Sequence, residues 1–409
     1  MIDRLATSRA ARRGDQAGQR PFSSRLRLVG SSALVATTLF VAGCGALRDD
    51  QGRPLTTLDP KGVQSNRIDD LVTPVFAVAG IVFVLVLGAV AIFSIKFRRK
   101  PGDVDGVDEP VQIHGIPRLE WAWTIAPAIL LGALAVLNVQ TIWKLEDRDK
   151  DALTVEVYGQ QWWWEYRYDV NDDGKPDVIT ANQMVIPAGR QINLVIRSND
   201  VIHSFWIPSL NGKKDAVPGR THVWSLEADK PGLYQGTCTE FCGLSHAYMR
   251  MEVKAVSAAE YETWLEDQQK PAEVPTDDTP DDTTDDSLVF TGYTEFKNNC
   301  AQCHQVDGLG YDKELNDGTP DPDYGGANHP LTSGNAPNLT HLMSRNKFAG
   351  NLFDLYTEDG QVNTSNLGNW LRNPKNMKPM APDENRGMPN LNLTSDQIEA
   401  LVAYLSTLK

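Results

Sequence analysis

The chain has 409 residues, of which 41% are hydrophobic, and its formal net charge is −14 at pH 7. This acidic balance argues against nucleic acid as a partner, because a phosphate backbone attracts basic surfaces. The chain contains five cysteines, and each of them lies in a short motif that suggests a role, so none is left over for a structural disulfide.

The first 43 residues have the pattern of a bacterial signal peptide. Positive charges are scattered from Arg4 to Arg27, and the following residues 28–43 carry no charge. The sequence Val-Ala-Gly-Cys that ends at Cys44 resembles a bacterial lipobox, which implies a lipidated N-terminus at Cys44. We therefore expect cleavage after residue 43 and an external segment over residues 44–70. An uncleaved membrane anchor with a buried cysteine is the alternative.

Two apolar stretches are long enough to cross a membrane as helices, which takes about 20 residues each. They run from Leu71 to Phe97 and from Trp121 to Val139, so we expect a transmembrane helical hairpin over residues 71–143. The connector between them opens with four positive residues within 96–100, and positive residues mark the cytoplasmic side of a membrane. Both ends of the hairpin are therefore expected outside, in agreement with a lipidated, external Cys44.

From residue 152 to residue 257 the sequence is typical of β-strands. Segments such as LTVEVYGQQWWWEYRY and QINLVIRSN are rich in valine, tyrosine and tryptophan, and Gly, Pro and Asn-Asp turns bound them. We expect an all-β domain over this range.

The segment CTEFCGLSHAYM, from Cys238 to Met249, carries the most specific signal in the chain. Two thiolates, an imidazole and a thioether follow one another at the spacing Cys-x3-Cys-x3-His-x2-Met, and His203 lies upstream. Sulfur and imidazole ligands favour copper or zinc over hard cations. Zinc could be held by Cys238, Cys242, His246 and His203, but a weak thioether ligand is typical of copper sites. A zinc site, or a disulfide between the two cysteines, is the alternative.

This segment resembles the dinuclear copper site of cytochrome c oxidase subunit II, whose motif Cys-x-Glu-x-Cys-x3-His-x2-Met is matched at every position. The two-helix hairpin resembles the same family. The resemblance implies a cupredoxin-like Greek-key barrel over residues 152–257, with the motif on the loop between its last two strands. It implies that Cys238 and Cys242 bridge two copper ions. The remaining ligands would be His203 and Met249 on one ion, and His246 and the backbone carbonyl of Glu240 on the other.

Two further roles follow from the same resemblance. The Glu240 side chain would face a magnesium ion at the contact with the catalytic subunit. The family also reads His-Gln-Trp-aromatic-Trp at the position where this chain has Gln160 to Trp164, and its first tryptophan receives electrons from cytochrome c. Trp162 is therefore the candidate electron-accepting residue, although packing in the barrel is the alternative. Strand alternation places Trp162 and Trp164 on one face and Trp163 on the other.

Residues 268–287 are predicted to form an acidic flexible linker. The segment PAEVPTDDTPDDTTDDS is rich in aspartate, threonine and proline and has almost no apolar side chains, so it cannot bury a core. It would tether the last part of the chain to the all-β domain at an effective concentration on the order of millimolar.

The motif CAQCH has the Cys-x-x-Cys-His spacing of c-type haem attachment. Cys300 and Cys303 would form the two thioether bonds, and His304 would be the proximal iron ligand. A redox-active cysteine pair or half of a zinc site is the alternative. The context favours haem, because helical patterns flank the motif and an amphipathic segment, LTSDQIEALVAYLSTL, ends the chain.

Residues 288–409 thus resemble an all-α class I cytochrome c domain. That resemblance makes Met388 the distal iron ligand, because the family's methionine precedes a proline and lies ahead of the last helix. Met377 and Met380 lie close enough in the sequence to compete for this role.

The whole chain is expected to be a multidomain membrane protein that resembles subunit II of a respiratory haem–copper oxidase with a fused cytochrome c domain. The resemblance implies that external cytochrome c or a cytochrome bc-type complex reduces haem c. The electron would then pass, through Trp162 and the dinuclear copper centre, to the oxygen-reducing subunit I. Subunits I and III are the implied partners in a proton-translocating cytochrome-c oxidase.

The implied location is a bacterial cell membrane, with both termini and both redox domains on the external face. Two other functions fit the motifs. The chain could be the electron-accepting subunit of a copper-containing nitric oxide reductase, or a stand-alone membrane-tethered electron carrier.

Overall fold

The computed structural model describes residues 55–104, 115–170, 174, 176–273, 275, 284–306, 336–384 and 386–409. All of them belong to one unit, residues 51–409. The predicted signal peptide, the predicted lipidation site Cys44 and residues 276–283 of the predicted linker lie outside the described residues.

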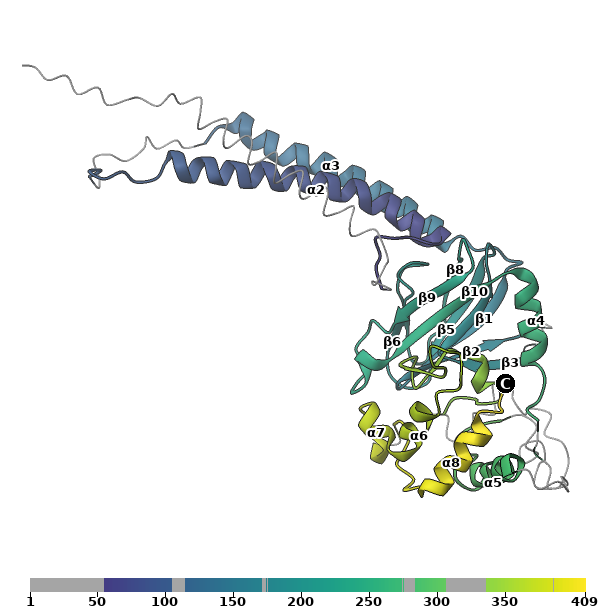
Figure 1. Cartoon of the computed structure of the whole chain (residues 1–409). Helices are drawn as coiled ribbons and strands as arrows, with labels where there is room; N and C mark the ends of the chain where they lie inside the picture. The colour runs from purple at the N-terminus through teal and green to yellow at the C-terminus, as the bar shows by residue number, and fades with distance from the viewer. Residues whose placement is uncertain are drawn as a thin grey trace, which may run out of the picture. The chain divides into compact units, whose positions relative to one another are not determined.

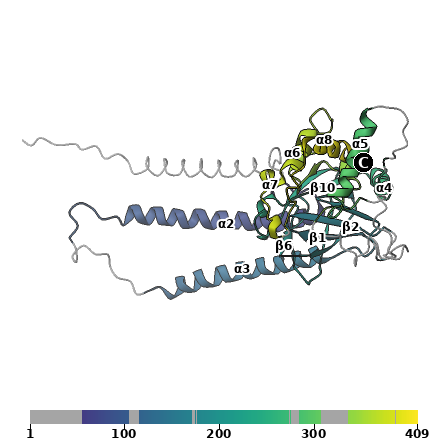
Figure 2. The same ribbon diagram turned by 90° about the horizontal axis from the view of Figure 1, so that it is seen from below.

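Two long helices, α2 (Val63–Lys96) and α3 (Pro117–Glu146), lie side by side (Figures 1 and 2). Both are long and apolar enough to cross a membrane. α2 begins eight residues before the apolar stretch that predicted it, because its first turns are polar and pack against the β-domain instead of facing lipid. α3 begins with Pro117 at its first position, where the fixed φ of proline suits a helix start.

The start of α2 is anchored to the β-domain by hydrogen bonds. Lys61 N donates to Ser209 O at 2.7 Å, and Ser65 Oγ donates to the same carbonyl at 2.6 Å. Gly62 lies so close to the domain that a Cβ atom there would be 1.9 Å from Glu227 O, so only glycine fits. The hairpin is therefore joined to the β-domain at the N-terminal end of α2 by close backbone contacts.

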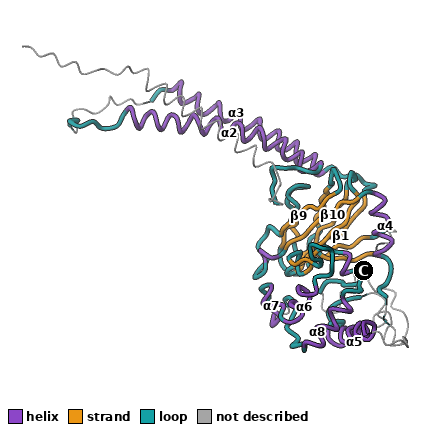
Figure 3. Tube along the Cα trace, in the orientation of Figure 1, coloured by secondary structure: helices purple, strands orange, loops and turns teal. Residues whose placement is uncertain are grey.

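The β-domain consists of two main sheets (Figure 3). The larger has the order β3-β2-β1-β5-β8, formed by Val178–Ala181, Trp163–Tyr168, Leu153–Gln160, Ile192–Ser198 and His222–Leu226. The smaller has the order β4-β10-β9, formed by Gln183–Pro187, Arg250–Val256 and Gly232–Thr237. A separate pair joins β6 (His203–Phe205) to β7 (Lys214–Ala216).

Within the two main sheets, β1 runs parallel to β5 and β4 runs parallel to β10, while the other neighbours are antiparallel. Large side chains from both sheets, among them Trp164, Tyr166, Ile196 and Met251, are fully buried in one core. The predicted all-β, cupredoxin-like domain is confirmed, because two sheets bury their apolar faces against each other. His203 is the first residue of β6.

One helix of the β-domain was not predicted. α4 (Ala258–Gln268) begins with a capping box in which Ser257 Oγ accepts from Glu260 N and the Glu260 carboxylate accepts from Ser257 N. Its Tyr261 and Leu265 are buried against the core, and the ring of Trp264 lies 5.2 Å from that of Tyr168. α4 therefore extends the core of the β-domain as far as the start of the linker segment.

The C-terminal part contains α5 (Thr284–Asn299), α6 (Thr364–Arg372), α7 (Pro374–Met377) and α8 (Ser395–Leu405). α5 and α8 cross closely, because a Cβ on Gly292 would be 1.9 Å from Ala400 O. Tyr404 packs between Tyr293 and Phe296 at this crossing. The predicted helical domain is confirmed, with the addition of a small hairpin of β11 (Lys347–Phe348) and β12 (Phe353–Asp354).

Candidate copper and haem sites

The loop between β9 and β10 carries the sulfur-rich motif, as predicted from the sequence. The loop is closed at its base by a hydrogen bond from Cys238 N to Met249 O at 3.0 Å, and a short helical turn, His246–Tyr248, precedes Met249. The ligand atoms of His203, Cys238 and Cys242 all lie within 4.8 Å of one another. The strands thus hold β6 and the loop at the same end of the barrel.

All six predicted ligands come together at this place. The Cys238 and Cys242 sulfurs are 3.9 Å apart, and both cysteines are free. Met249 Sδ lies 3.8 Å from Cys242 Sγ, and His246 Nδ1 lies 3.5 Å from it. On the other side, Cys238 Sγ is 3.9 Å from His203 Nδ1 and 3.3 Å from the carbonyl oxygen of Glu240. Six donor atoms, two of which are the thiol sulfurs, exceed the four that a structural zinc ion uses.

The surroundings of the two thiols favour ionisation of one of them. A hydrogen bond from Cys242 lowers the pKa of Cys238, and the same pairing raises the pKa of Cys242. His203 is oriented by Asp200, whose Oδ1 lies 2.8 Å from His203 Nε2, so Nδ1 points to the sulfur. Gly159 leaves room for this ring, because a Cβ there would be 2.8 Å from it. The arrangement suits a metal centre with bridging thiolates.

Trp162 is attached directly to the sulfur-rich loop. Its indole Nε1 donates to the carbonyl of Cys242 at 2.9 Å, and Gln161 Nε2 donates to the same oxygen at 2.6 Å. Trp162 and Trp164 belong to the barrel core, while Trp163 lies outside that core. Trp162 lies in the turn between β1 and β2, so the predicted strand alternation does not include it. The indole Nε1 of Trp163 is buried without a hydrogen-bond partner.

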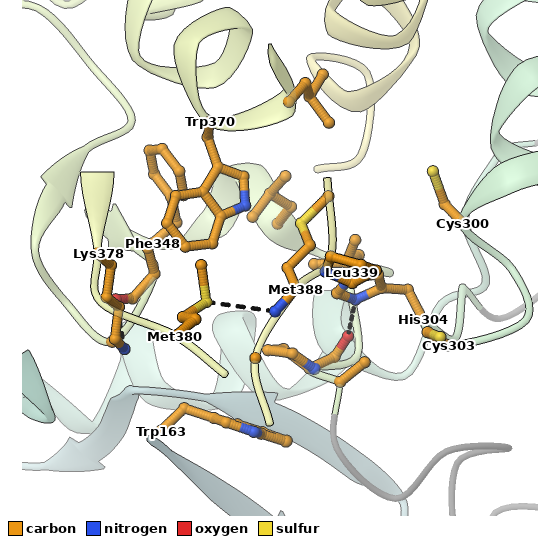
Figure 4. Close-up of a pocket in the computed structure, with 18 of the residues that line it drawn as sticks. Trp163, Cys300, Cys303, His304, Leu339, Phe348, Trp370, Lys378, Met380 and Met388 are labelled. Carbon is orange, nitrogen blue, oxygen red and sulfur yellow. Dashed lines mark hydrogen bonds between the residues drawn. The ribbon is translucent and has the colours of Figure 1, made fainter. Parts of the chain in front are cut away.

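Residues of the CAQCH motif line a cavity at a second place in the molecule (Figure 4). Cys300, Cys303 and His304 line it together with Met388, so the structure brings together every residue predicted to hold haem. His304 Nδ1 donates to the carbonyl of Pro337 at 2.8 Å, which leaves Nε2 for a metal ligand bond. Burial lowers the pKa of His304, so the ring stays neutral as such a bond requires.

The three candidate distal methionines differ in their surroundings. Met388 is half-buried and lines the cavity. Met380 also lines it, but its sulfur accepts a hydrogen bond from Met388 N at 3.3 Å, and its side chain is packed against Gly387. Met377 is not among the residues that line the cavity. The geometry therefore favours Met388 among the three.

The cavity also holds a buried cation that fits a ligand with carboxylates. Arg345 is only 5% exposed; its Nη2 donates to Asn338 O at 2.5 Å, while its Nε has no partner. Burial lowers the pKa of Arg345 to about 10. Because an unpaired buried charge is costly, a propionate-bearing group such as haem would satisfy this guanidinium.

Residues of the β-domain complete the wall of this cavity. Gln161, Trp162 and Trp163 line it beside Lys378, and Figure 4 shows Trp163 facing the side of the cavity that contains Met380 and Met388. Lys378 was not identified from the sequence. It is buried, and burial lowers its pKa to about 7. No local pattern marks this lysine, so only the tertiary structure reveals it.

Three family models match the chain. They are the transmembrane domain of cytochrome c oxidase subunit II over residues 59–141, the periplasmic domain of the same subunit over residues 169–256, and cytochrome c over residues 290–409. The matches cover the hairpin, most of the β-domain and the C-terminal part in the order in which they occur.

Two similar proteins match almost the whole length of the chain. The chain is 35% identical over 387 residues to cytochrome c oxidase subunit 2 of Alkalihalophilus pseudofirmus, which covers 91% of this chain and 94% of that protein. It is 32% identical over 388 residues to cytochrome c oxidase subunit 2 of Bacillus sp. strain PS3, with the same shares covered. The crystal structure of the periplasmic domain of subunit II of cytochrome oxidase from Bradyrhizobium japonicum is 32% identical and covers 30% of this chain and 96% of its own, with a TM-score of 0.28.

Proposed function

The chain belongs to the cytochrome c oxidase subunit II family and carries a C-terminal cytochrome c domain, and from this premise we propose that it relays electrons from haem c, through a dinuclear copper centre, to the oxygen-reducing subunit I. The observation that carries the proposal is the position of Trp162. Its indole is hydrogen-bonded to the carbonyl of Cys242 in the sulfur-rich loop, and the same side chain lines the haem cavity.

The copper centre is held by the six converging residues. Cys238 and Cys242 would hold two copper ions together with His203, His246, Met249 and the carbonyl of Glu240, whose donor atoms converge here. When bound, the pair supplies a one-electron site that changes geometry little between its redox states. The protein contributes a rigid loop between β9 and β10 and, through Asp200, a fixed orientation of His203.

The haem site is held by the second group of residues. Cys300 and Cys303 would attach haem c covalently, and His304 and Met388 would bind its iron, a pair that raises the haem potential. Pro337 orients His304 through the hydrogen bond to its Nδ1, and Arg345 supplies a buried cation for a propionate. Electrons that arrive here come from external cytochrome c or a cytochrome bc-type complex.

The exposed side of the sulfur-rich loop between β9 and β10 provides the contact with the other subunits of the enzyme. Phe241 is 76% exposed and Leu244 is 60% exposed, although both lie in an ordered loop beside the ligands. An apolar rim of this kind suits a protein interface. The side chain of Glu240, which is exposed and directly precedes Phe241, faces a magnesium ion shared with subunit I. Subunit III completes the proton-translocating complex.

The membrane arrangement follows from the two helices and the charge of their connector. Lys96, Arg98, Arg99 and Lys100 lie at the inner end of α2, so the connector is cytoplasmic and both redox domains are external. The chain is made with a signal peptide over residues 1–43 and is lipidated at Cys44, which places a second anchor on the same external side as the start of α2.

The proposal is tested by metal analysis and EPR of this subunit in the purified oxidase. We expect two copper ions and one covalent haem for each chain, hyperfine structure from one electron shared by both coppers, and a low-spin haem signal. One copper ion, or zinc, in the loop would contradict the dinuclear assignment. A subunit that purifies without subunit I would instead support a stand-alone electron carrier.

A further inference from the structure

Lys378 joins the C-terminal helical domain, called the haem domain from here on, to the β-domain, called the copper domain. It follows α7, and its side chain is 4% exposed. Its Nζ donates to the carbonyl of Trp162 at 2.7 Å and to the carbonyl of Ala349 at 3.1 Å. One acceptor thus lies in the copper domain and the other in the haem domain. A single ammonium group therefore bonds to both sides of the boundary.

The backbone beside Lys378 approaches the copper domain too closely for a side chain. Gly350 has a φ of +82°, and its carbonyl accepts from Arg250 N at 3.1 Å. A Cβ on Gly350 would lie 2.7 Å from Lys378 Nζ, 3.0 Å from Tyr248 O and 3.2 Å from Trp162 O. The turn between β11 and β12 is therefore fitted against the start of β10 and the end of the sulfur-rich loop.

Further hydrogen bonds join the same two surfaces. Ser245 Oγ, between the ligands Cys242 and His246, donates to the carbonyl of Pro379. Arg386 Nε donates to Gln161 Oε1 at 2.7 Å, and Asn346 Nδ2 donates to Glu252 Oε1 at 2.9 Å. These contacts join the same two domains as Lys378, and Ser245 is the residue directly before His246.

A lysine side chain is unusual at a buried position between two domains such as that of Lys378. A buried cation is costly unless it is paired, yet none of the ion pairs among the described residues includes Lys378, and its acceptors are neutral carbonyls. An apolar side chain would fill the same space at lower cost. The directed hydrogen bonds from Lys378 Nζ to Trp162 O and Ala349 O, in contrast, fix the position of one domain on the other.

We propose that Lys378 is a positioning residue that docks the fused haem domain on the copper domain in one orientation, so that Trp162 and Trp163 form a wall of the haem cavity. The tethered domain is then a docked component of the relay and not a freely diffusing one. The rate at which haem and copper exchange an electron depends on this docking, and this dependence rests on the proposed function. The docking of the two domains does not rest on the proposed function.

Docking is measured without reference to electron transfer. A protease site is placed within residues 276–283 of the full-length, haem- and copper-loaded protein, the chain is cleaved there, and gel filtration shows whether the haem domain stays bound. We expect it to remain with the copper domain in the unsubstituted protein. Lys378→Met should weaken the association about 10- to 100-fold, since the hydrogen bond from Lys378 Nζ to the carbonyl of Trp162 across the boundary is lost. The control is Lys375→Met, which removes an exposed lysine three residues away.

Gly350→Ala provides a second variant, because its Cβ would lie 3.0 Å from Tyr248 O and 3.2 Å from Trp162 O and would oppose the contact sterically. It should release the haem domain as well. The optical spectrum of covalent haem shows that the domain is folded in each variant. Release of the unsubstituted haem domain after cleavage, or equal retention in Lys378→Met and Lys375→Met, would overturn the proposal.

The same variants separate docking from the relay. If Lys378→Met releases the haem domain and also slows electron transfer from haem to copper, both proposals hold. If it releases the domain while copper is reduced at an unchanged rate, docking stands and the relay through this contact fails.

Discussion

The indole Nε1 of Trp162 donates a hydrogen bond of 2.9 Å to the backbone carbonyl of Cys242, and the carbonyl of Trp162 accepts one of 2.7 Å from Lys378. One residue is thus bonded to the sulfur-rich loop through its side chain and to the haem domain through its backbone. This relationship links the two cofactor sites through a single buried amino acid.

Trp162→Phe should slow electron transfer from haem to copper while leaving both cofactors bound. The substitution keeps an aromatic ring but removes the hydrogen bond to Cys242, which should cost about 1 kcal/mol of stability. Trp224→Phe is a matched control, because the Trp224 indole also donates to a backbone carbonyl, that of Gly212 at 3.2 Å, away from both sites. Flash photolysis measures the transfer rate. Equal rates in the two variants would show that Trp162 has no special part in the relay.

Met249→Leu should retain both copper ions and change the redox potential of the centre. The thioether is a weak copper ligand, so its loss alters the electronic properties more than the affinity. Met251→Leu makes the same exchange two residues away in the barrel core, where a volume-conserving substitution costs less than about 1.5 kcal/mol. Redox titration with EPR detection compares the two proteins. A shift of the same size in Met251→Leu would attribute the effect to packing.

Met388→Leu should convert the haem to a high-spin form and lower its midpoint potential, because an axial ligand that raises the potential is lost. Met380→Leu should leave a low-spin haem, since the Met380 sulfur already accepts a hydrogen bond from Met388 N. Optical and EPR spectra of the oxidised proteins distinguish the two outcomes. The reverse pattern would make Met380 the ligand.

Arg345→Gln should lower the midpoint potential of the haem. Arg345 is a buried cation beside the haem cavity, and a nearby positive charge disfavours the more positive ferric state. Removing it should shift the potential by roughly 50 mV, which corresponds to about 1 kcal/mol for one electron. Arg372→Gln, at an exposed position on α6, serves as the control. An unchanged potential in Arg345→Gln would place the propionates elsewhere.

The sequence reveals the two sites because their chemistry is concentrated in short motifs. Most of each proposed ligand set lies within one short segment, from Cys238 to Met249 or from Cys300 to His304. Only His203 and Met388 lie at a distance from these segments in the sequence. The two membrane-spanning helices are also predicted from a local pattern, a continuous apolar stretch in each. α2 nevertheless begins earlier, at Val63, because its polar first turns pack against the β-domain. α4 was missed, even though the Ser257–Glu260 capping box marks its start.

The junction between the domains could not be predicted in this way. Lys378 and Trp162 lie 216 positions apart, and neither sits in a pattern that indicates the other. Their contact depends on the close approach of Gly350, whose role is visible only once both domains are placed. Local periodicity and motif spacing carry no information on such a contact.

We propose that haem c reduces the dinuclear copper centre within this chain. Photoreduction of the haem in the purified oxidase, with haem and copper absorbance followed in the same sample, tests this electron transfer. We expect the haem to be reoxidised at the rate at which copper is reduced, and we expect Cys242→Ser, which removes a proposed bridging thiolate, to abolish both phases. Copper that is reduced while the haem stays reduced, or a haem that is reoxidised equally fast in Cys242→Ser, would contradict it.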